Sequence, residues 1–410
     1  MAPLSIKPVP LSLVEYTAKA LETDRFGQEQ DGLTQLGFGL FGEVGGLLAA
    51  LKKASRDKLQ NSKAFVAGEE IGDALWYLVV LAHHGKVAPD QLGEAAMSNL
   101  REKLGEGPHR RNGGMTFEEL DSLAELHYAS HHEKREMLLR EVAFAAGTFT
   151  QAPEADYVTW TADRVATTLG RLLGQLTMVA RSFGLDLASI ARDNLDKIKA
   201  RWPGDQQPAP YVPLFDDTGF SKYEQLPRGD FKIDFIPRVV RGRDLVVQQW
   251  NGVNIGDPLT DNSNVPDWYR YHDVFHLAYM AHLGWSPVLR ALLKLKRKSR
   301  PDIDENQDGA RAIIIEEGIA TWIFNHAKER GDDFADVEAG KLDFNLLKQV
   351  QTMVRGYEVH TCPPWQWELA ILDGFKMFRA LKAASQGAVI VNIEQHSIKF
   401  EGLSAPKEST

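Results

Sequence analysis

Several features that would narrow the class of this protein are scarce or missing from its sequence. Among 410 residues there is a single cysteine, Cys362, which excludes a disulfide scaffold and fits a reducing compartment. No apolar run approaches the roughly 18 residues of a membrane span, and residues 1–10 lack the basic and apolar regions of a secretory signal. Glycine-rich phosphate loops and nucleophile elbows are also missing. We therefore expect a cytoplasmic protein without a membrane partner.

The charge balance adds a further exclusion. Lysine and arginine number 47 against 56 aspartate and glutamate residues, which gives a formal net charge of −9. This balance argues against general binding of nucleic acid. Hydrophobic residues make up 43% of the chain, enough to bury substantial cores, and the length favours two or three domains.

Residues 11–203 have the pattern of nearly continuous amphipathic helix. Apolar residues recur at helical spacing, as in Leu33, Leu36, Leu40 and Val44. Turn-rich breaks fall at 105–114 and at 152–153. Four prolines between 203 and 213 then end the helical region and mark the expected linker.

The pattern changes after the expected linker. Period-two alternation at 231–235 and an apolar run at 245–250, separated by a turn with Gly242, predict a β-hairpin. Residues 388–393 and 396–400 predict a second hairpin. Between the two, helices are expected to resume near Pro266, because proline suits the first helical position. The C-terminal half is thus expected to be α+β.

The helical region contains an internal repeat. An offset of 98 residues aligns Glu43 with Glu141 and Gly72 with Gly170, and an offset of 95 aligns Asn99 with Asn194. Chance similarity between helices is the alternative. An offset held across two motifs favours duplication, with a short deletion in the second copy.

Carboxylates cluster in the first copy of the repeat. Glu70 and Asp73 stand three residues apart and project from one helix face, with Glu69 beside them. An antiparallel hairpin would bring Glu43 alongside. Crowded carboxylates repel one another unless a cation binds them, and oxygen ligands suit Mg²⁺ or Mn²⁺. The alternative is a solvated helix face, although the apolar neighbours of this pair favour packed helices.

The same residues carry a resemblance to the MazG-like all-α NTP pyrophosphohydrolases. The family signature is E-x-x-E, a connection, then E-x-x-D, and here LFGEVGG at 40–46 is followed by GEEIGDALWYL at 68–78. Asn99 and Lys103 resemble the asparagine and lysine positions of the family, and residues 192–203 look like a second copy of that closing segment. The resemblance covers residues 33–203, nearly half of the chain.

This sequence departs from the family pattern at several positions. Gly46 stands where the second glutamate of E-x-x-E belongs. The second copy has Phe144 at that position and Thr168 and Arg171 in place of the E-x-x-D pair. The second copy is therefore expected to be a structural half that lets one chain imitate the helical dimer of the family.

The resemblance implies hydrolysis of a nucleoside triphosphate to the monophosphate and pyrophosphate. Mg²⁺ or Mn²⁺ held by Glu43, Glu70 and Asp73, with Glu69 as a further ligand, would neutralise phosphate charge and activate a water. The residues expected to contact the substrate are Lys52, Lys53, Asn99 and Lys103, with Trp76 stacking on the base.

A second constellation lies in the C-terminal half. His272 and His276 are four residues apart on a predicted helix, which is metal-ligand spacing, and Glu317 is expected to meet them from another helix. Two histidines and a glutamate suit a transition metal such as Zn²⁺, with Asp273 as a base or as the partner of a histidine. The alternative is a pair of satisfied histidines at a helix contact. Neither the zinc-peptidase nor the HD-phosphohydrolase motif fits, so this half is assigned to no family.

The predicted architecture is mainly α. Tandem MazG-like four-helix repeats at 11–115 and 116–205 precede an α+β domain with a small antiparallel sheet at 211–405. The leading function is a metal-dependent nucleoside triphosphate pyrophosphohydrolase. The alternative, favoured by Gly46, is a nucleotide-sensing module without turnover, fused to a C-terminal metal hydrolase for phosphoester or peptide bonds. Self-association into a homo-oligomer and the identity of the base, the sugar and the C-terminal substrate stay open.

Overall fold

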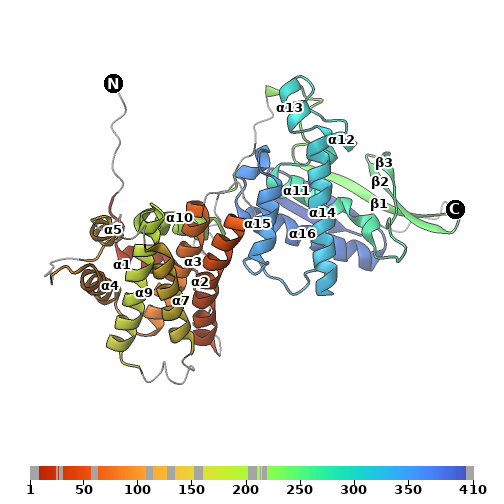
Figure 1. Cartoon of the computed structure of the whole chain (residues 1–410). Coiled ribbons are helices and arrows are strands. Elements are labelled where there is room, and N and C mark those ends of the chain that lie inside the picture. The colour runs from red at the N-terminus through yellow and green to blue at the C-terminus, as the bar shows by residue number, and fades with distance from the viewer. Residues whose placement is uncertain are drawn as a thin grey trace, which may run out of the picture. The chain divides into compact units, whose positions relative to one another are not determined.

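A computed structural model of the chain describes residues 9–24, 26, 31–56, 63–107, 114–126, 134–151, 160–201, 210–212, 214 and 219–402, with 53–56 as backbone only. The chain divides into two compact units, Met1–Lys199 and Ala200–Thr410 (Figure 1). Most of the expected linker at 203–213, the break at 152–153 and the side chain of Lys53 lie outside the described residues. Each unit has its own hydrophobic core.

The N-terminal unit is built from helices, as the apolar periodicity predicts. Polar residues fix several helix starts, because the first N–H groups of a helix lack partners within it. Ser12 accepts a hydrogen bond from the Glu15 N–H at 3.1 Å, and Thr116 and Glu119 form a capping box. The helices are α1 (Leu13–Leu21), α2 (Gly32–Arg56), α3 (Lys63–His84), α4 (Pro89–Leu104), α5 (Phe117–Glu125), α7 (Arg135–Gln151), α9 (Ala162–Ser182) and α10 (Leu187–Arg201).

The proposed repeats pack by exchanging their closing helices. Helix α4 of the first copy packs against α9 of the second (Figure 1). At this contact Gly170 faces Ala95 and Ala96. In the reciprocal contact, Gly72 of α3 faces Ile190 and Asn194 of α10. The two glycines occupy equivalent positions in the repeat alignment, and so do their contacts. This reciprocal packing supports the proposal of a duplication.

Helix α2 departs from the expectation on apolar runs. Its segment Gly32–Lys52 is long and apolar enough to cross a membrane by length and composition, with a mean hydropathy of 1.3, and 28% of it is buried. Leu36 and Leu40 face the core of the bundle, whereas Phe38 and Phe41 are exposed. One such helix is weak evidence of a membrane span, so the absence of a membrane partner stays a prediction.

The C-terminal unit contains one antiparallel sheet of five strands in the order β3-β2-β1-β4-β5. Both predicted hairpins are present within it, and the mainly helical chain with a small antiparallel sheet confirms the predicted fold class. The strands are β1 (Asp230–Val240), β2 (Arg243–Trp250), β3 (Val253–Leu259), β4 (Gly387–Asn392) and β5 (Ser397–Glu401).

Two tight turns shape the first three strands. Arg241 and Gly242 join β1 to β2 with φ of 51° and 74°, and Asn251 and Gly252 join β2 to β3 with φ of 52° and 77°. Positive φ at both central residues is the type I′ geometry that matches the twist of a hairpin. Strand β3 was not predicted from the sequence, although the Asn-Gly pair before it is a strong hairpin signal.

Helices cover the sheet and carry the histidines. Of these, α11 and α16 contact β4 and β5, while Phe231, Ile233 and Phe235 of β1 are buried in the core. The prediction of a helix from Pro266 is wrong, because a 3-10 turn at Tyr269–Tyr271 comes first and α11 starts at Asp273. The helices of this unit are α11 (Asp273–Leu283), α12 (Pro287–Leu292), α13 (Pro301–Asn306), α14 (Ala310–Arg330), α15 (Phe344–Met353) and α16 (Pro364–Ala384).

Candidate functional site

Asp73 on α3 is held by residues of α10, the closing helix of the second repeat. Its carboxylate accepts hydrogen bonds from the Lys197 ammonium at 2.6 and 2.7 Å and from the Asn194 amide at 3.1 Å. The other end of that amide accepts the Tyr16 hydroxyl at 2.8 Å. Burial, and next the charge of Asp73, raise the pKa of Tyr16 well above its usual value. Asp73 is thus the centre of a network that joins both repeats.

Glu70 lies against the turn of α2 where the family pattern has its second glutamate. A Cβ atom at Gly46 would stand 2.4 Å from Glu70 Oε2, so the carboxylate reaches over this glycine. Glu43 precedes Gly46 by one helical turn and shares its face of α2. The hairpin of α2 and α3 therefore brings Glu43 and Glu70 to facing helices, as predicted.

The N-terminal carboxylates are not gathered as tightly as a preformed metal site. Within the described ranges, the group of three or more metal-type side chains whose ligand atoms lie within 4.8 Å of one another is His272, His276 and Glu317. Asp73 is paired with Lys197, and Glu69 is exposed. The oxygen-only donor set still suits Mg²⁺ or Mn²⁺, and the N-terminal site stays a prediction.

The structure places the residues predicted to contact the substrate in different surroundings. Trp76 is corrected to a core residue, because it is buried and its indole N–H donates to the Ala20 carbonyl at 3.2 Å and Thr23 Oγ1 at 3.1 Å. Lys103 on α4 pairs with Glu141 on α7. Asn99 lies on the same helix, with its side-chain oxygen beside α9 at Gly174. Lys52 is exposed near the end of α2.

Sequence reasoning missed the residues that do contact Asp73. The repeat alignment contained the signal, because it pairs Asn194 with Asn99 and treats residues 192–203 as a second closing segment. What it did not reveal is the exchange of closing helices, which places Asn194 and Lys197 beside the carboxylates of the first copy.

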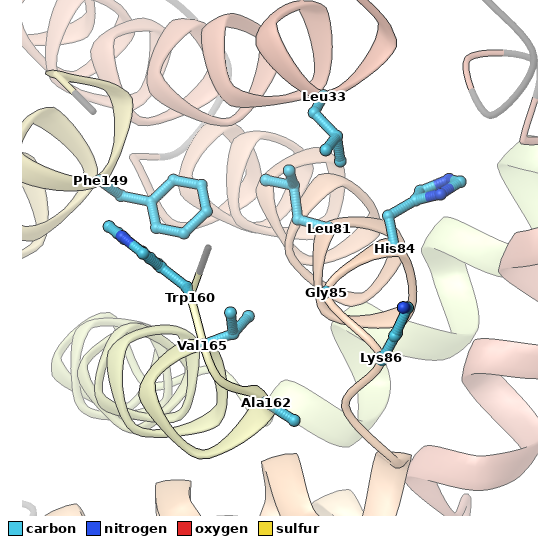
Figure 2. A pocket seen from close by; sticks show the side chains of 9 residues that line it. All are labelled: Leu33, Leu81, His84, Gly85, Lys86, Phe149, Trp160, Ala162 and Val165. Carbon is cyan, nitrogen blue, oxygen red and sulfur yellow. The ribbon is translucent and has the colours of Figure 1, made fainter. Parts of the chain in front are cut away.

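An aromatic cavity lies at the C-terminal end of α3. It has a volume of about 230 Å³, and the residues that line it include Phe149, Trp160, Leu33, His84 and Lys86 (Figure 2). Helical rise places the backbone of His84 about 16 Å along the axis from Asp73. The cavity is therefore separate from the carboxylates.

His276 in the C-terminal unit is fully buried, and one of its two ring nitrogens has a hydrogen-bond partner. Its Nδ1 lies 2.8 Å from Glu316 Oε1, which makes Nδ1 a donor to the carboxylate. Its Nε2 is buried without a hydrogen-bond partner and lies 3.5 Å from Glu317 Oε2. A buried nitrogen left this way costs free energy unless a ligand meets it.

His272 presents the same atom to the same place. Its Nδ1 lies 2.9 Å from the Tyr269 carbonyl oxygen, and its ring stacks on Tyr269 with centroids 4.2 Å apart. Its Nε2 lies 3.7 Å from Glu317 Oε2 and 3.1 Å from Asp273 Oδ1. The structure thus brings His272, His276 and Glu317 together, as the sequence predicted.

The two adjacent glutamates differ in burial. Glu317, the residue expected to meet the histidines, has a side chain that is 39% exposed, whereas that of Glu316 is fully buried. Glu316 was missed as a site residue. Its carboxylate accepts hydrogen bonds from His276, from Ser286 Oγ at 2.7 Å and from the Val288 N–H at 2.8 Å. The turn before α12 therefore fixes Glu316, and Glu316 fixes His276.

The pKa shifts of His276 and Glu317 indicate that a positive charge on the imidazoles is stabilised. Burial lowers the pKa of His276, but the charge of Glu316, its hydrogen bond to Nδ1 and the neighbouring Glu317 carboxylate outweigh burial and raise that pKa well above its usual value. Burial likewise raises the pKa of Glu317, and His276 and His272 reverse that shift to a net lowering. Either a proton or a metal cation on the imidazoles would supply this positive charge.

Asp273 completes the surroundings of the histidines. One of its carboxylate oxygens accepts a hydrogen bond from the buried Gln248 of β2 at 2.5 Å, and the other faces His272. The sheet thereby fixes the first residue of α11. Asp273 could contact a species bound between the histidines.

Comparison with known families bears on this half of the chain. Residues 210–404 match a family model described as the MazG C-terminal domain. The match corrects the assignment of the C-terminal half to no family, and it supports a relationship to MazG proteins through that half. No curated protein and no solved structure gives a match. The resemblance of residues 33–203 stays a prediction.

Proposed function

We propose that this protein is a metal-dependent nucleoside triphosphate pyrophosphohydrolase that releases a nucleoside monophosphate and pyrophosphate. The observation that carries the proposal is the contact of Asp73 with Lys197 and Asn194, which joins the carboxylate helix of one repeat to a basic helix of the other. The match of residues 210–404 to the MazG C-terminal domain adds support, because it relates the chain to nucleotide-hydrolysing proteins.

Glu43, Glu70 and Asp73 are the residues that would hold Mg²⁺ or Mn²⁺. Their oxygens are the ligands these ions prefer, and the reach of Glu70 over Gly46 brings it toward the helix of Glu43. When bound, the ion supplies charge neutralisation at the phosphates and a water of lowered pKa. Glu69, exposed on the same helix, is available as a further oxygen ligand.

Lys197 has a different task in the proposed reaction. In the chain without substrate its ammonium neutralises Asp73. A triphosphate is a stronger competitor for that ammonium, because phosphate oxygens carry more charge than one carboxylate. Lys197 would then turn to the phosphates and leave Asp73 to the cation, so that substrate and metal bind together.

Paired substitutions test the residues of this site. We expect Glu43→Gln and Asp73→Asn to lower pyrophosphate release by at least about 100-fold, since each removes one charged ligand of the cation. The matched control is Glu141→Gln, at the equivalent position of the second repeat, which should leave turnover within about twofold. The measurement is pyrophosphate release from NTP and dNTP with Mg²⁺ or Mn²⁺, with circular dichroism to check folding.

Two outcomes would overturn the proposal. Unchanged turnover in Glu43→Gln and Asp73→Asn would show that the N-terminal carboxylates are not the site. Binding of NTP without pyrophosphate release by the folded wild-type chain would favour a nucleotide-sensing module, the reading that Gly46 suggests.

A further inference from the structure

We propose that His272, His276 and Glu317 form a mononuclear site for a divalent first-row transition metal in the C-terminal unit. The three residues each offer one ligand atom within 4.8 Å of the others. The Nε2 atoms of His272 and His276 lie 3.7 and 3.5 Å from Glu317 Oε2, and we take these three atoms as the ligands. The inference is independent of the proposed function, because no residue is shared with the N-terminal carboxylates.

The first argument is the orientation of His276. Its ring is completely buried, and its Nδ1–H is committed to Glu316, so the remaining lone pair is on Nε2. In the neutral ring that nitrogen is an acceptor without a hydrogen-bond partner, and it faces Glu317. A metal-bound histidine has this arrangement, with one ring nitrogen on the metal and the other donating to a carboxylate or a carbonyl.

The second argument is that His272 repeats the arrangement. Its Nδ1 is held by the Tyr269 carbonyl, and its Nε2 points toward Glu317 Oε2. Both imidazoles therefore use Nδ1 for the protein and present Nε2 to one point. A helical backbone at His272 keeps the spacing of four residues on one face, even though α11 itself starts one residue later.

A structural histidine in the same unit provides the contrast. His282 is also buried, yet both of its nitrogens are satisfied, Nδ1 by the Tyr211 hydroxyl at 3.0 Å and Nε2 by Asp373 at 2.8 Å. Both ring nitrogens of this buried histidine therefore have protein partners. His276 differs from His282, because its Nε2 has no hydrogen-bond partner.

The negative charges of the carboxylates around the site favour binding of a cation. Glu316, Glu317 and Asp273 surround the two histidines, and in the described part of the chain the ion pairs of these carboxylates are with the histidines alone. A divalent ion would balance Glu317 and Asp273 where two neutral imidazoles cannot. The competing arrangement is a histidinium paired with Glu317.

The ligand set narrows the metal. Imidazole with one carboxylate suits Zn²⁺, Fe²⁺ or Mn²⁺ better than Mg²⁺, which prefers oxygen ligands. Three protein ligands leave at least one position for water or substrate, the pattern of catalytic rather than structural ions. Asp273 Oδ1 lies 3.1 Å from His272 Nε2 and is placed to accept a hydrogen bond from a bound water.

Metal binding by the full chain tests the site directly. The protein is stripped with a chelator, loaded separately with Zn²⁺, Fe²⁺ or Mg²⁺, desalted, and analysed for bound metal by mass spectrometry. We expect one transition ion per chain in the wild type and at least about 100-fold weaker binding in Glu317→Gln. Glu329→Gln, an exposed position of the same helix, is the matched control and should bind as the wild type does.

Glu316 acts as a positioning residue and has its own readout. Glu316→Gln should weaken binding by about 10- to 100-fold and shift the visible absorption of bound Co²⁺, which a purely structural role would not do. Equal metal retention in Glu317→Gln and the wild type would overturn the proposal. So would a folded wild-type chain that keeps no transition ion and is not stabilised by one, because the histidines would then be an ion pair.

The N-terminal site is kept apart by a further variant. The double substitution Glu43→Gln/Asp73→Asn should leave transition-metal binding unchanged while it abolishes pyrophosphate release. Loss of metal in that variant would overturn the C-terminal assignment, and loss of activity alone would concern only the proposed function.

Discussion

Asp121 on α5 is a single carboxylate that connects two helices of the N-terminal unit. It is buried and accepts the backbone N–H groups of Leu187 at 2.7 Å and Ala188 at 2.9 Å, at the start of α10. These are N–H groups that a helix cannot satisfy internally. Burial raises the pKa of Asp121 to about 6, and the two N–H groups reduce that shift without cancelling it.

This raised pKa predicts a pH-dependent stability of the N-terminal unit. Because the folded chain binds the proton more tightly than the unfolded chain, with its value of 3.8, the favourable contribution is complete below that value and is lost as the pH rises through about 6. Relative to Asp121→Asn, the wild type should lose up to about 3 kcal/mol between about pH 4 and pH 7. Urea unfolding of both proteins across this range is the measurement, and a constant difference would contradict the prediction.

Residue patterns predicted the cluster of two histidines and a glutamate in the C-terminal unit better than its surroundings. The spacing of His272 and His276, together with Glu317, was enough to predict that these three residues lie close to one another. Burial of Glu316 depends on Ser286 and the Val288 N–H, which belong to a turn with no signature of its own. The N-terminal site shows the same limit, since Lys197 reaches Asp73 through a packing that sequence spacing does not specify.

The exchange of α4 and α10 is the main feature at the level of elements. Helix periodicity and turn residues predicted most helices and both hairpins, because these depend on neighbours in sequence. The pairing of β1 with β4 joins strands about 150 residues apart, and it could not be predicted from local pattern. The start of α11 was misplaced because Pro266 precedes a 3-10 turn instead of a helix.

A glycine pair tests the exchange of helices. A Cβ at Gly170 would lie 2.5 Å from Ala95 Cβ and 3.0 Å from the Ala95 carbonyl carbon of α4. Gly170→Ala should therefore destabilise the unit by about 1–3 kcal/mol through overpacking. Gly42 on α2 has nothing within 4 Å, and Gly42→Ala should stabilise by about 0.5–1 kcal/mol through helix propensity.

Urea unfolding of the two variants beside the wild type gives the comparison. If both alanines had the same stabilising effect, α4 would not approach α9 as closely as described. The opposite signs expected here separate close packing from intrinsic helix preference.

At the scale of the whole molecule, each unit has its own core and its own candidate chemistry. The carboxylates of the N-terminal unit suit Mg²⁺ or Mn²⁺, and the histidines of the C-terminal unit suit an ion that prefers nitrogen. The C-terminal unit is the one that matches the MazG C-terminal domain. The two proposals together describe a nucleotide hydrolase with a second metal centre in the C-terminal unit.

The most direct test of the central claim is the identity of the products. The full chain is incubated with each common NTP and dNTP in the presence of Mg²⁺ or Mn²⁺, and the phosphorus species are resolved by ³¹P NMR. The account predicts nucleoside monophosphate and pyrophosphate in equal amounts from at least one substrate. Release of nucleoside diphosphate and phosphate, or no consumption of any nucleotide by the folded protein, would contradict it.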